Sequence, residues 1–423
     1  MSHIASPPAL PRTAWLIVIL LMPVALLNYL DRQMLASMKT SVMADITTIH
    51  TEQNWGFMLG QFKWVYAVCS LLGGYVADRF SRRYVICMSL FVWSAVTYLT
   101  GHAYTFHELL WTRSLMGISE AFYMPAALAL ITDYHVGHTR SRAVGLHHTA
   151  MYCGVILGGF GGYVADSPDF GWRSAFTICG VFGILYSLPL TYFLRDAARP
   201  ANLNAIPEER RKTSIFEAFP ELLTNPSFIL LVLYFTLPAF AGWVVRDWMP
   251  AILKDRFLIK QGPAGVYATC SWQIAAMFGA AIGGSLADRW MNFTMRGRTL
   301  ASALGMSFMV PAMWGMGYAA TLPWAVAFLA LFGLGWGFFD CNNMPILSQI
   351  VRPHLRATGY GIMNFVSIGC GGLADWGFGR LKDHGVPLSQ IFGWFATAAI
   401  VSIVLVLLIR PRRELTDFGA GHS

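Results

Sequence analysis

The sequence predicts an all-α integral membrane protein in which twelve transmembrane helices form two pseudo-symmetric six-helix bundles. Hydrophobic residues make up 56% of the 423 positions and charged residues only 12%, whereas a soluble domain carries about 25% charged residues. Twelve apolar runs, each about 20 residues long and so able to cross a bilayer, follow one another along the chain. Short sequence repeats recur at intervals of three and six runs, which indicates a duplicated architecture.

The twelve runs fall into two sets of six on either side of a polar segment. We place them near 14–36, 54–77, 84–101, 107–131, 143–164, 173–194, 227–252, 264–287, 299–317, 322–346, 357–379 and 389–409. The first run is too long for a signal-peptide core, so we interpret it as a retained span. The predicted domains are an N-terminal bundle at 1–194, a linker at 195–226, a C-terminal bundle at 227–410 and a tail at 411–423.

Basic residues are distributed unevenly between alternate loops. With a cytoplasmic N-terminus, the inner loops, linker and tails hold most of the cations, and the outer side holds only Lys39, Arg173, Lys254, Arg256, Lys260, Arg380 and Lys382. This bias predicts that both termini are cytoplasmic. We expect the protein to lie in the inner (plasma) membrane of the cell. We therefore do not interpret the net charge of +8 as nucleic-acid binding. The seven cysteines show no CxxC spacing and are expected to be free buried thiols.

Internal repeats define the predicted symmetry. GGYVAD occurs at Gly73–Asp78 and again at Gly161–Asp166, and related copies, GGSLAD and GGLAD, lie at Gly283–Asp288 and Gly371–Asp375. The spacing within each pair is 88 residues, which covers three spans, so the two copies fall on opposite membrane faces. This pattern is typical of inverted three-helix repeats nested within two parallel halves.

The two halves also repeat their charged positions. The first span of each half contains a proline followed by an adjacent acid and arginine, and the fourth span of each half contains an acid followed by a Met-Pro pair. The matched positions are Pro23, Asp31 and Arg32 with Pro238, Arg246 and Asp247, and Glu120, Met124 and Pro125 with Asp340, Met344 and Pro345.

Charged residues inside the spans are the main functional signal. A charge at the centre of a bilayer helix costs roughly 2.5–3.5 kcal/mol, so such residues normally face a bundle interior or a wet cavity. Arg113 and Glu120 are seven residues apart, about two helical turns, so they can line one cavity but cannot easily pair. We expect Arg32 to face the substrate path and Asp31 to face Arg113. The alternative is a charge network that only locks spans one and four together.

Other polar residues in the spans allow two interpretations each. Lys63 either extends toward the membrane surface or adds a second cation to the cavity. Arg246 and Asp247 either pair with each other or extend the site into the second half. Asp340, near Asn342, either recognises an amine or hydroxyl groups or is satisfied by neighbouring helices. Tyr152, Gln273 and Asn364 are candidate hydroxyl-binding residues.

Several other functions find no support in the sequence. His135 and His138 lack the helix, acid and third ligand of a metal site, so no metal or cofactor is expected. No GxxxxGK[ST] or GxSxG motif is present, so neither ATP-driven pumping nor hydrolase chemistry is expected and the protein is not predicted to be an enzyme.

Several motifs resemble one transporter family along essentially the whole chain. GGYVADRFSRR at Gly73–Arg83 resembles the loop signature of the major facilitator superfamily, with Ser81 where the usual pattern has glycine. RSLMGISEAFYMPA, RSRAVG, DWMPAIL and the region of Asn364 are similar to its anion:cation symporter branch, which includes hexuronate and galactonate permeases. NYLDR also resembles the Spinster branch.

The resemblance implies roles for the charged residues. The acids of spans one and four, Asp31 and Glu120, would couple to protons, and the arginines would contact a substrate carboxylate, which suits a guanidinium fork. The candidate substrate-binding residues are Arg32, Arg113, Tyr29, Lys63, Tyr66, Tyr152, Gln273, Asn342 and Asn364, with Arg246, Asp247 and Asp340 as secondary candidates.

A second charged cluster is predicted to act as a gate. A carboxylate at a helix end that faces cationic loops can hold the inner side shut by pairing across the halves. The residues concerned are Asp78, Arg79, Arg82 and Arg83 in the first half and Asp288 and Arg289 in the second.

Together these observations predict a monomeric, proton-coupled symporter of a small organic anion, such as a hexuronate or hexonate. Its partners would be the anion, protons and the lipid bilayer. The alternatives are a Spinster-like carrier of a lysolipid or other amphiphile and a nontransporting membrane sensor.

Overall fold

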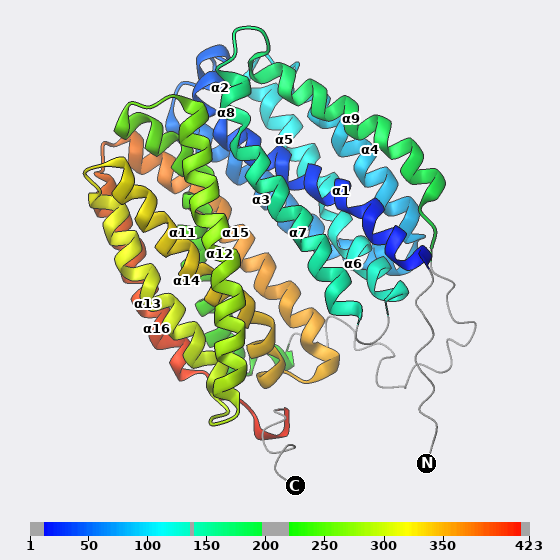
Figure 1. Ribbon diagram of the computed structural model, residues 1–423, viewed down its shortest axis with the longest axis vertical. Coiled ribbons are helices and arrows are strands. Elements are labelled where there is room, and N and C mark those ends of the chain that lie inside the picture. Colours follow the sequence, from blue (N-terminus) through cyan, green and yellow to red (C-terminus); the bar gives the residue numbers. More distant parts are fainter. Residues whose placement is uncertain (1–11, 136–138, 197–219, 416–423) are drawn as a thin grey trace.

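Two bundles of helices lie side by side in the computed structural model, which describes residues 12–135, 139–196 and 220–415 (Figure 1). The first bundle contains α1 (Arg12–Ser37), α2 (Lys39–Asp45), α3 (Glu52–Arg79), α4 (Arg82–Thr100), α5 (Phe106–Ala121), α6 (Tyr123–Tyr134), α7 (Arg140–Gly159), α8 (Gly161–Ala165) and α9 (Gly171–Phe193). The second contains α11 (Pro226–Phe257), α12 (Gln261–Met291), α13 (Gly297–Tyr318), α14 (Leu322–Ile350), α15 (Arg356–Asp383) and α16 (Leu388–Leu408), with short 3₁₀ turns η4 (Pro353–Leu355) and η5 (Arg413–Leu415).

The predicted all-α fold with twelve spans is confirmed. Every predicted span coincides with a helix, and the fourth and fifth spans are each interrupted once, at Phe122 and Phe160. Most of the predicted linker and the end of the predicted tail fall at 197–219 and 416–423, outside the described residues.

Local sequence signals explain where several helices begin. Thr51 accepts a hydrogen bond from the backbone N–H of Asn54 at the start of α3. Thr105 and Glu108 form a reciprocal capping box at the start of α5. Asn225 caps α11, which begins with a proline, where the missing N–H has no cost. The ends of these spans are therefore encoded by residues next to the apolar runs.

The helices differ in how apolar they are. In the described part of the chain, nine helical segments are long and apolar enough to cross a membrane by themselves, and α3, α7 with α8, and α15 are not among them. These more polar helices pack against the other half: α3 against α15, and α7 and α8 against α12. Their composition therefore reflects contact with protein, where lipid does not solvate the side chains.

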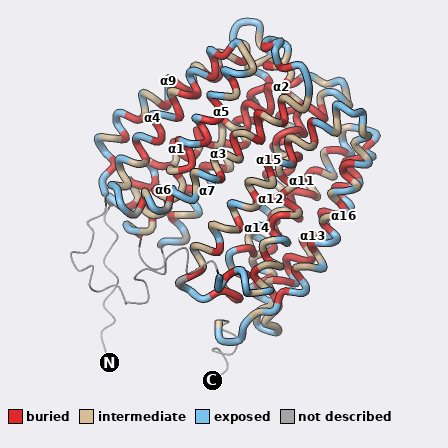
Figure 2. Tube along the Cα trace, turned by 180° about the vertical axis from the view of Figure 1, so that it is seen from behind, coloured by how far each residue is buried: buried red, intermediate tan, exposed pale blue. Residues whose placement is uncertain are grey.

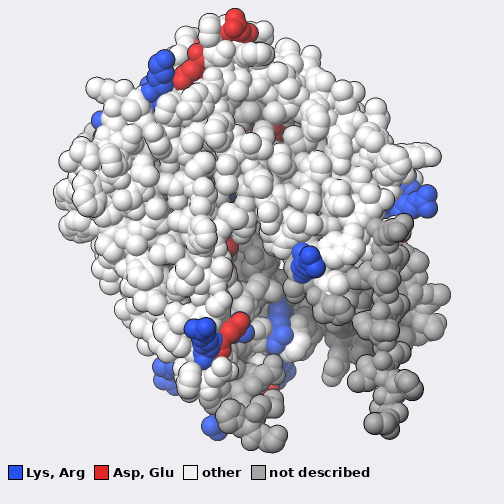
Figure 3. All heavy atoms as spheres, viewed as in Figure 1, with Lys and Arg blue, Asp and Glu red and all other residues white. Residues whose placement is uncertain are grey.

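The two bundles touch at one end and separate toward the other (Figures 1 and 2). At the closed end the side-chain amide of Gln33 donates to Thr269 Oγ1 at 3.3 Å. The side-chain oxygen of Gln261 accepts from the backbone N–H of Thr40 at 3.0 Å. The space-filling view shows a hollow between the bundles at the opposite end, where α1 begins and α16 ends (Figure 3). We call these the outer and inner ends, following the predicted orientation.

Backbone contact between α3 and α15 seals the outer end. A Cβ atom on Gly56 would lie 2.2 Å from the backbone oxygen of Asp375, and a Cβ on Gly60 would lie 2.7 Å from that of Gly372. Such distances leave no room for a side chain, so glycine at these positions is what allows the two halves to meet.

We expect Gly56→Ala to open the outer end. Overpacking of this kind typically costs 1–3 kcal/mol, which would raise the ratio of outward-open to inward-open protein by about fivefold or more. Double electron–electron resonance distances across the outer end would measure the change. Gly377→Ala is the matched control on α15, because a Cβ there meets nothing within 4 Å. Equal distance distributions for the two variants would contradict this account of the seal.

Candidate functional site

The centre of the first half contains an ion pair between α1 and α5. Arg32 Nε lies 2.7 Å and Nη2 2.5 Å from Oε2 of Glu120. The Glu120 side chain is fully buried and that of Arg32 is 14% exposed. The guanidinium carbon also lies 5.3, 4.8 and 4.9 Å from the ring centroids of Tyr29, Phe62 and Tyr66. Arg32 is thus held between a carboxylate and aromatic rings, and it retains some contact with the central space.

Asp31 and Arg113 lie behind this pair. Asp31 accepts a hydrogen bond from Thr97 at 2.8 Å, and Arg113 donates one to Thr100 at 3.1 Å. Each residue is only 2% exposed. They interact electrostatically with each other and with Glu120 without forming a direct ion pair. In this conformation Arg113 is therefore a buried member of the charge cluster, whereas Arg32 is the arginine that reaches the central space.

Arg246 brings a cation from the second half to the same place. Its guanidinium carbon lies 5.3 Å from the Tyr29 ring centroid and 5.6 Å from that of Trp243. The Tyr29 ring is therefore shared by Arg32 of one half and Arg246 of the other. Nη2 of Arg246 is buried without a hydrogen-bond partner. Of the two interpretations of Arg246, the geometry favours an extension of the site into the second half.

Lys63 does not extend to the membrane surface. It is 4% exposed and forms ion pairs across the halves with Asp247 of α11 (2.5 Å) and Asp375 of α15. Asp247 therefore pairs with Lys63 in place of its neighbour Arg246, and a role of Lys63 as a second cation of the substrate cavity stays a prediction. Asp375 was missed by the sequence analysis. The available signal was its place inside an apolar span, at the end of the fourth repeat.

The remaining candidates lie on α7, α12, α14 and α15. Asp340 is exposed, and among the described residues no lysine or arginine forms an ion pair with it. Asp340 interacts electrostatically with Tyr152 of the first half and with Tyr360 of the second, which lies beside Asn364. Asn342 donates to the backbone oxygen of Phe338 on its own helix. Gln273 is buried on α12. Asp340, Tyr152 and Asn364 are thus brought together, whereas Asn342 serves its own helix.

The residues of the predicted inner gate pair within their own halves. Arg79 lies over Tyr75, Arg82 pairs with Asp133, Arg83 donates to the backbone oxygen of Thr191, and Asp288 lies 3.5 Å from Arg298. Arg289 is exposed, and the side chain of Asp78 falls outside the described residues. The inner end is open here, so closure by these residues stays a prediction.

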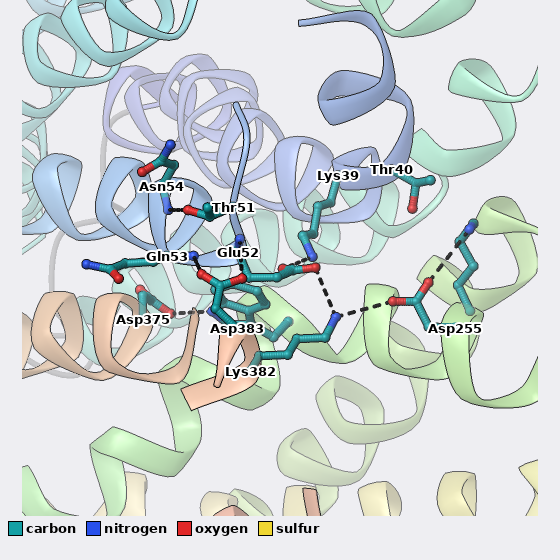
Figure 4. A network of polar contacts seen from close by, with 12 residues as sticks. Lys39, Thr40, Thr51, Glu52, Gln53, Asn54, Asp255, Asp375, Lys382 and Asp383 are labelled. Carbon is teal, nitrogen blue, oxygen red and sulfur yellow. Dashed lines mark hydrogen bonds and ion pairs between the residues drawn. The ribbon is translucent and has the colours of Figure 1, made fainter. Parts of the chain in front are cut away.

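Charged contacts across the halves occur instead at the outer end (Figure 4). Glu52 of α3 pairs with Lys39 and, at 3.1 Å, with Lys382 of α15, which lies 3.3 Å from Asp255. Asp383 accepts hydrogen bonds from the backbone N–H groups of Glu52 and Gln53 at 2.9 and 2.8 Å. We call Lys39, Glu52, Asp255, Lys382 and Asp383 the outer network. No sequence signal identified it, because its members lie in separate helix ends.

Two helical halves that meet at one end, enclose buried charges and separate at the other end are an arrangement typical of membrane transporters. The model of the Major Facilitator Superfamily matches residues 21–374. The chain belongs to this superfamily, as the motifs suggested, and is a multi-pass membrane transporter of a family and fold that are typically non-enzymatic.

The relatives include several kinds of transporter. Protein spinster homolog 1 of Xenopus tropicalis is 27% identical over 370 residues, which cover 83% of this chain and 69% of the relative. An MFS-type efflux pump of Mycolicibacterium smegmatis is 28% identical and covers 88% of this chain and 85% of its own. A probable L-galactonate transporter of Escherichia coli is 25% identical, with coverage of 93% and 89%.

Solved structures support the fold. A bacterial homolog of the human lysosomal transporter Spinster, in an inward-facing and unoccupied conformation, has a TM-score of 0.77, with 22% identity and coverage of 96% of each chain. A D-xylose-proton symporter has a TM-score of 0.70, with 15% identity and coverage of 95% of this chain and 98% of its own.

Proposed function

We propose that this chain is a proton-coupled symporter of a small organic anion, of the hexuronate or hexonate class, in the inner (plasma) membrane. The observation that carries the proposal is the Arg32–Glu120 ion pair beside the central space. A substrate carboxylate that binds Arg32 competes with Glu120 for the same guanidinium. Once displaced, Glu120 is a buried carboxylate without its cation, and protonation relieves the cost of that charge. Binding of the anion and of the proton are thereby coupled.

Arg246 supports an anionic substrate. Two guanidinium groups on one tyrosine ring repel each other, and an anion between them removes that repulsion. Tyr29, Tyr66 and Tyr152 supply hydroxyl groups and apolar ring faces, a combination suited to a sugar-derived acid. The probable L-galactonate transporter among the relatives is consistent with this substrate class.

The test is uptake of labelled D-galactonate and D-glucuronate into proteoliposomes with an imposed pH gradient. We expect accumulation when the outside is acidic and none when the gradient is collapsed. Uptake that ignores the gradient would refute the coupling, and uptake of neutral sugars only would refute the anion.

A Spinster-like carrier of lysolipid or another amphiphile is the second candidate, favoured by the Spinster homologs among the relatives. A lysolipid that stabilises the purified protein against heat, when the sugar acids do not, would favour this function.

Asp340 provides a prediction specific to a polyhydroxy substrate. Because no described cation pairs with it, we expect Asp340→Asn to change the free energy of unfolding by less than about 0.5 kcal/mol. Loss of a charged acceptor for substrate hydroxyls should raise the KM for galactonate by about tenfold or more. Hexanoate, which has the carboxylate but no hydroxyls, is the matched ligand: if it competes equally well for Arg32 in both proteins, the defect lies in hydroxyl recognition. An unchanged KM for galactonate would contradict this role.

A further inference from the structure

Two carboxylates from the second half share one ammonium group from the first. Nζ of Lys63 lies 2.5 Å from Oδ2 of Asp247 and also pairs with Oδ2 of Asp375. Trp248 Nε1 donates to Oδ1 of Asp375 at 3.1 Å, and the Lys63 ammonium lies 4.2 Å from the ring centroid of Trp243. The side chains of Lys63, Asp247 and Asp375 are 4%, 10% and 0% exposed. We call these three residues the Lys63 cluster.

The balance of charge in this cluster depends on contact between the halves. α3, α11, α14 and η4 pack on α15, which carries Asp375. The charged neighbours of Asp375 are Lys63 from α3 and Asp247 from α11, and Arg246 of α11 acts on Asp247. The described side chains of α14 and η4 bring no charged group to Asp375. Among the described residues, the cationic partner of Asp375 therefore belongs to the other half.

Opening of the outer end must separate this cluster, because Lys63 moves with the first half and both acids move with the second. A buried carboxylate left without its cation costs several kcal/mol, and protonation is the cheapest way to remove that charge. We propose that Asp375 is a second proton-binding site, which takes up a proton from the outside as Lys63 withdraws and releases it as Lys63 returns. One proton is thereby gained and lost at Asp375 per cycle.

This inference goes beyond the proposed function, on which it depends only for the sidedness of the membrane. The outward-open state binds one more proton than the inward-open state at Asp375. By linkage, the ratio of outward-open to inward-open protein rises as pH falls, by up to tenfold per pH unit while Asp375 titrates. Asp247, the most exposed member of the cluster, provides the contact with solvent through which the proton leaves.

The outer network differs from the Lys63 cluster in one decisive respect. Each of its paired acids has a cation in its own half: Glu52 has Lys39, and Asp255 has Lys254 at 3.7 Å and Lys382 at 3.3 Å. Separation of the halves leaves these acids paired and hydrated. The outer network therefore holds the end shut without binding a proton when it opens, and it offers a matched control.

The experiment measures distances across the outer end by double electron–electron resonance in lipid nanodiscs. Spin labels would be placed at His107→Cys and Leu258→Cys, exposed positions at the outer ends of α5 and α11, after replacement of the seven native cysteines. All variants would carry Glu120→Gln, which removes the proton site of the proposed function, and the labelled protein without this change would be measured beside them. Burial and the nearby Lys382 lower the pKa of Lys39 to about 8, so a scan from about pH 5.5 to 7 leaves Lys39 charged.

We expect the outward-open fraction to rise as pH falls and Asp375→Asn to abolish this dependence while raising the outward-open fraction at pH 7. Lys63→Met, a change in the other half, should abolish it as well, and this variant decides the matter if Asp375→Asn does not fold. Glu52→Gln should raise the outward-open fraction with the pH dependence intact.

A pH dependence that survives both Asp375→Asn and Lys63→Met would overturn the proposal. A pH dependence unchanged by Glu120→Gln alone would instead count against Glu120 as a proton site.

Discussion

Glu120→Gln is expected to reduce accumulation of the organic anion against its gradient by the contribution of one coupled proton, while leaving exchange of the anion across the membrane intact. Glutamine keeps the size of the side chain but can neither hold Arg32 as an ion pair nor take up a proton. Arg32 is then available to the substrate at every pH, so the anion still binds and crosses. One coupled proton can support about tenfold accumulation per unit of pH gradient, and in the variant the accumulation ratio should fall by that factor.

The measurement is uptake and counterflow of labelled galactonate in the same proteoliposomes. Glu108→Gln is the matched control, because Glu108 lies on the same helix, is exposed and caps its N-terminus, a role that glutamine can also fill. Its accumulation ratio should equal that of the wild type. Gradient-driven accumulation by Glu120→Gln at the wild-type level would rule out Glu120 as the coupling residue.

Arg32→Ala is expected to remove recognition of the substrate carboxylate. Truncation of one partner of a close charge contact costs about 2 kcal/mol or more, which is about 30-fold in Kd. A thermal-shift screen of galactonate and glucuronate beside galactose and glucose would show this. The sugar acids should stabilise the wild type and lose that effect in the variant.

Stability has to be separated from binding in this test. Arg32→Ala leaves Glu120 buried without its cation, a change that commonly destabilises a protein by 3–5 kcal/mol. The double variant Arg32→Ala/Glu120→Gln removes both charges and should recover thermal stability without recovering the response to sugar acids. Arg32→Lys keeps the charge but loses the planar fork, so an intermediate response is expected. If sugar acids stabilise the double variant as they do the wild type, Arg32 is not the carboxylate site.

The fold could be predicted because its causes are local and repeated. A span is encoded by about 20 consecutive apolar residues, and the GGYVAD copies revealed the symmetry without any knowledge of contacts. Arg32 and Glu120 were identified as candidates in the same way, since a charged residue within an apolar run can be recognised from the sequence alone. The symmetry-related Arg246 was also found, through its match with the first span.

The partners of these charges could not be predicted from the sequence. Lys63 pairs with residues 184 and 312 positions away, and its choice of partners depends on how two bundles meet. The sequence does not indicate which end of the protein is closed. The contacts between the halves at the outer end were therefore missed, and a gate was predicted at the inner end. Asp375 was overlooked for the same reason: its repeat motif drew attention to symmetry, and its cation lies in the other half.

The low apolarity of α3, α7 with α8, and α15 has a consequence for biogenesis. A segment enters the bilayer from the translocon alone only when its own transfer free energy is favourable, and these three spans are not apolar enough by length and composition to meet that condition. They are expected to enter together with more apolar neighbours, α3 with α4 and α15 with α16. Deletion of the apolar neighbouring helix should therefore keep the polar span from entering the membrane, and cellular quality control would degrade the protein.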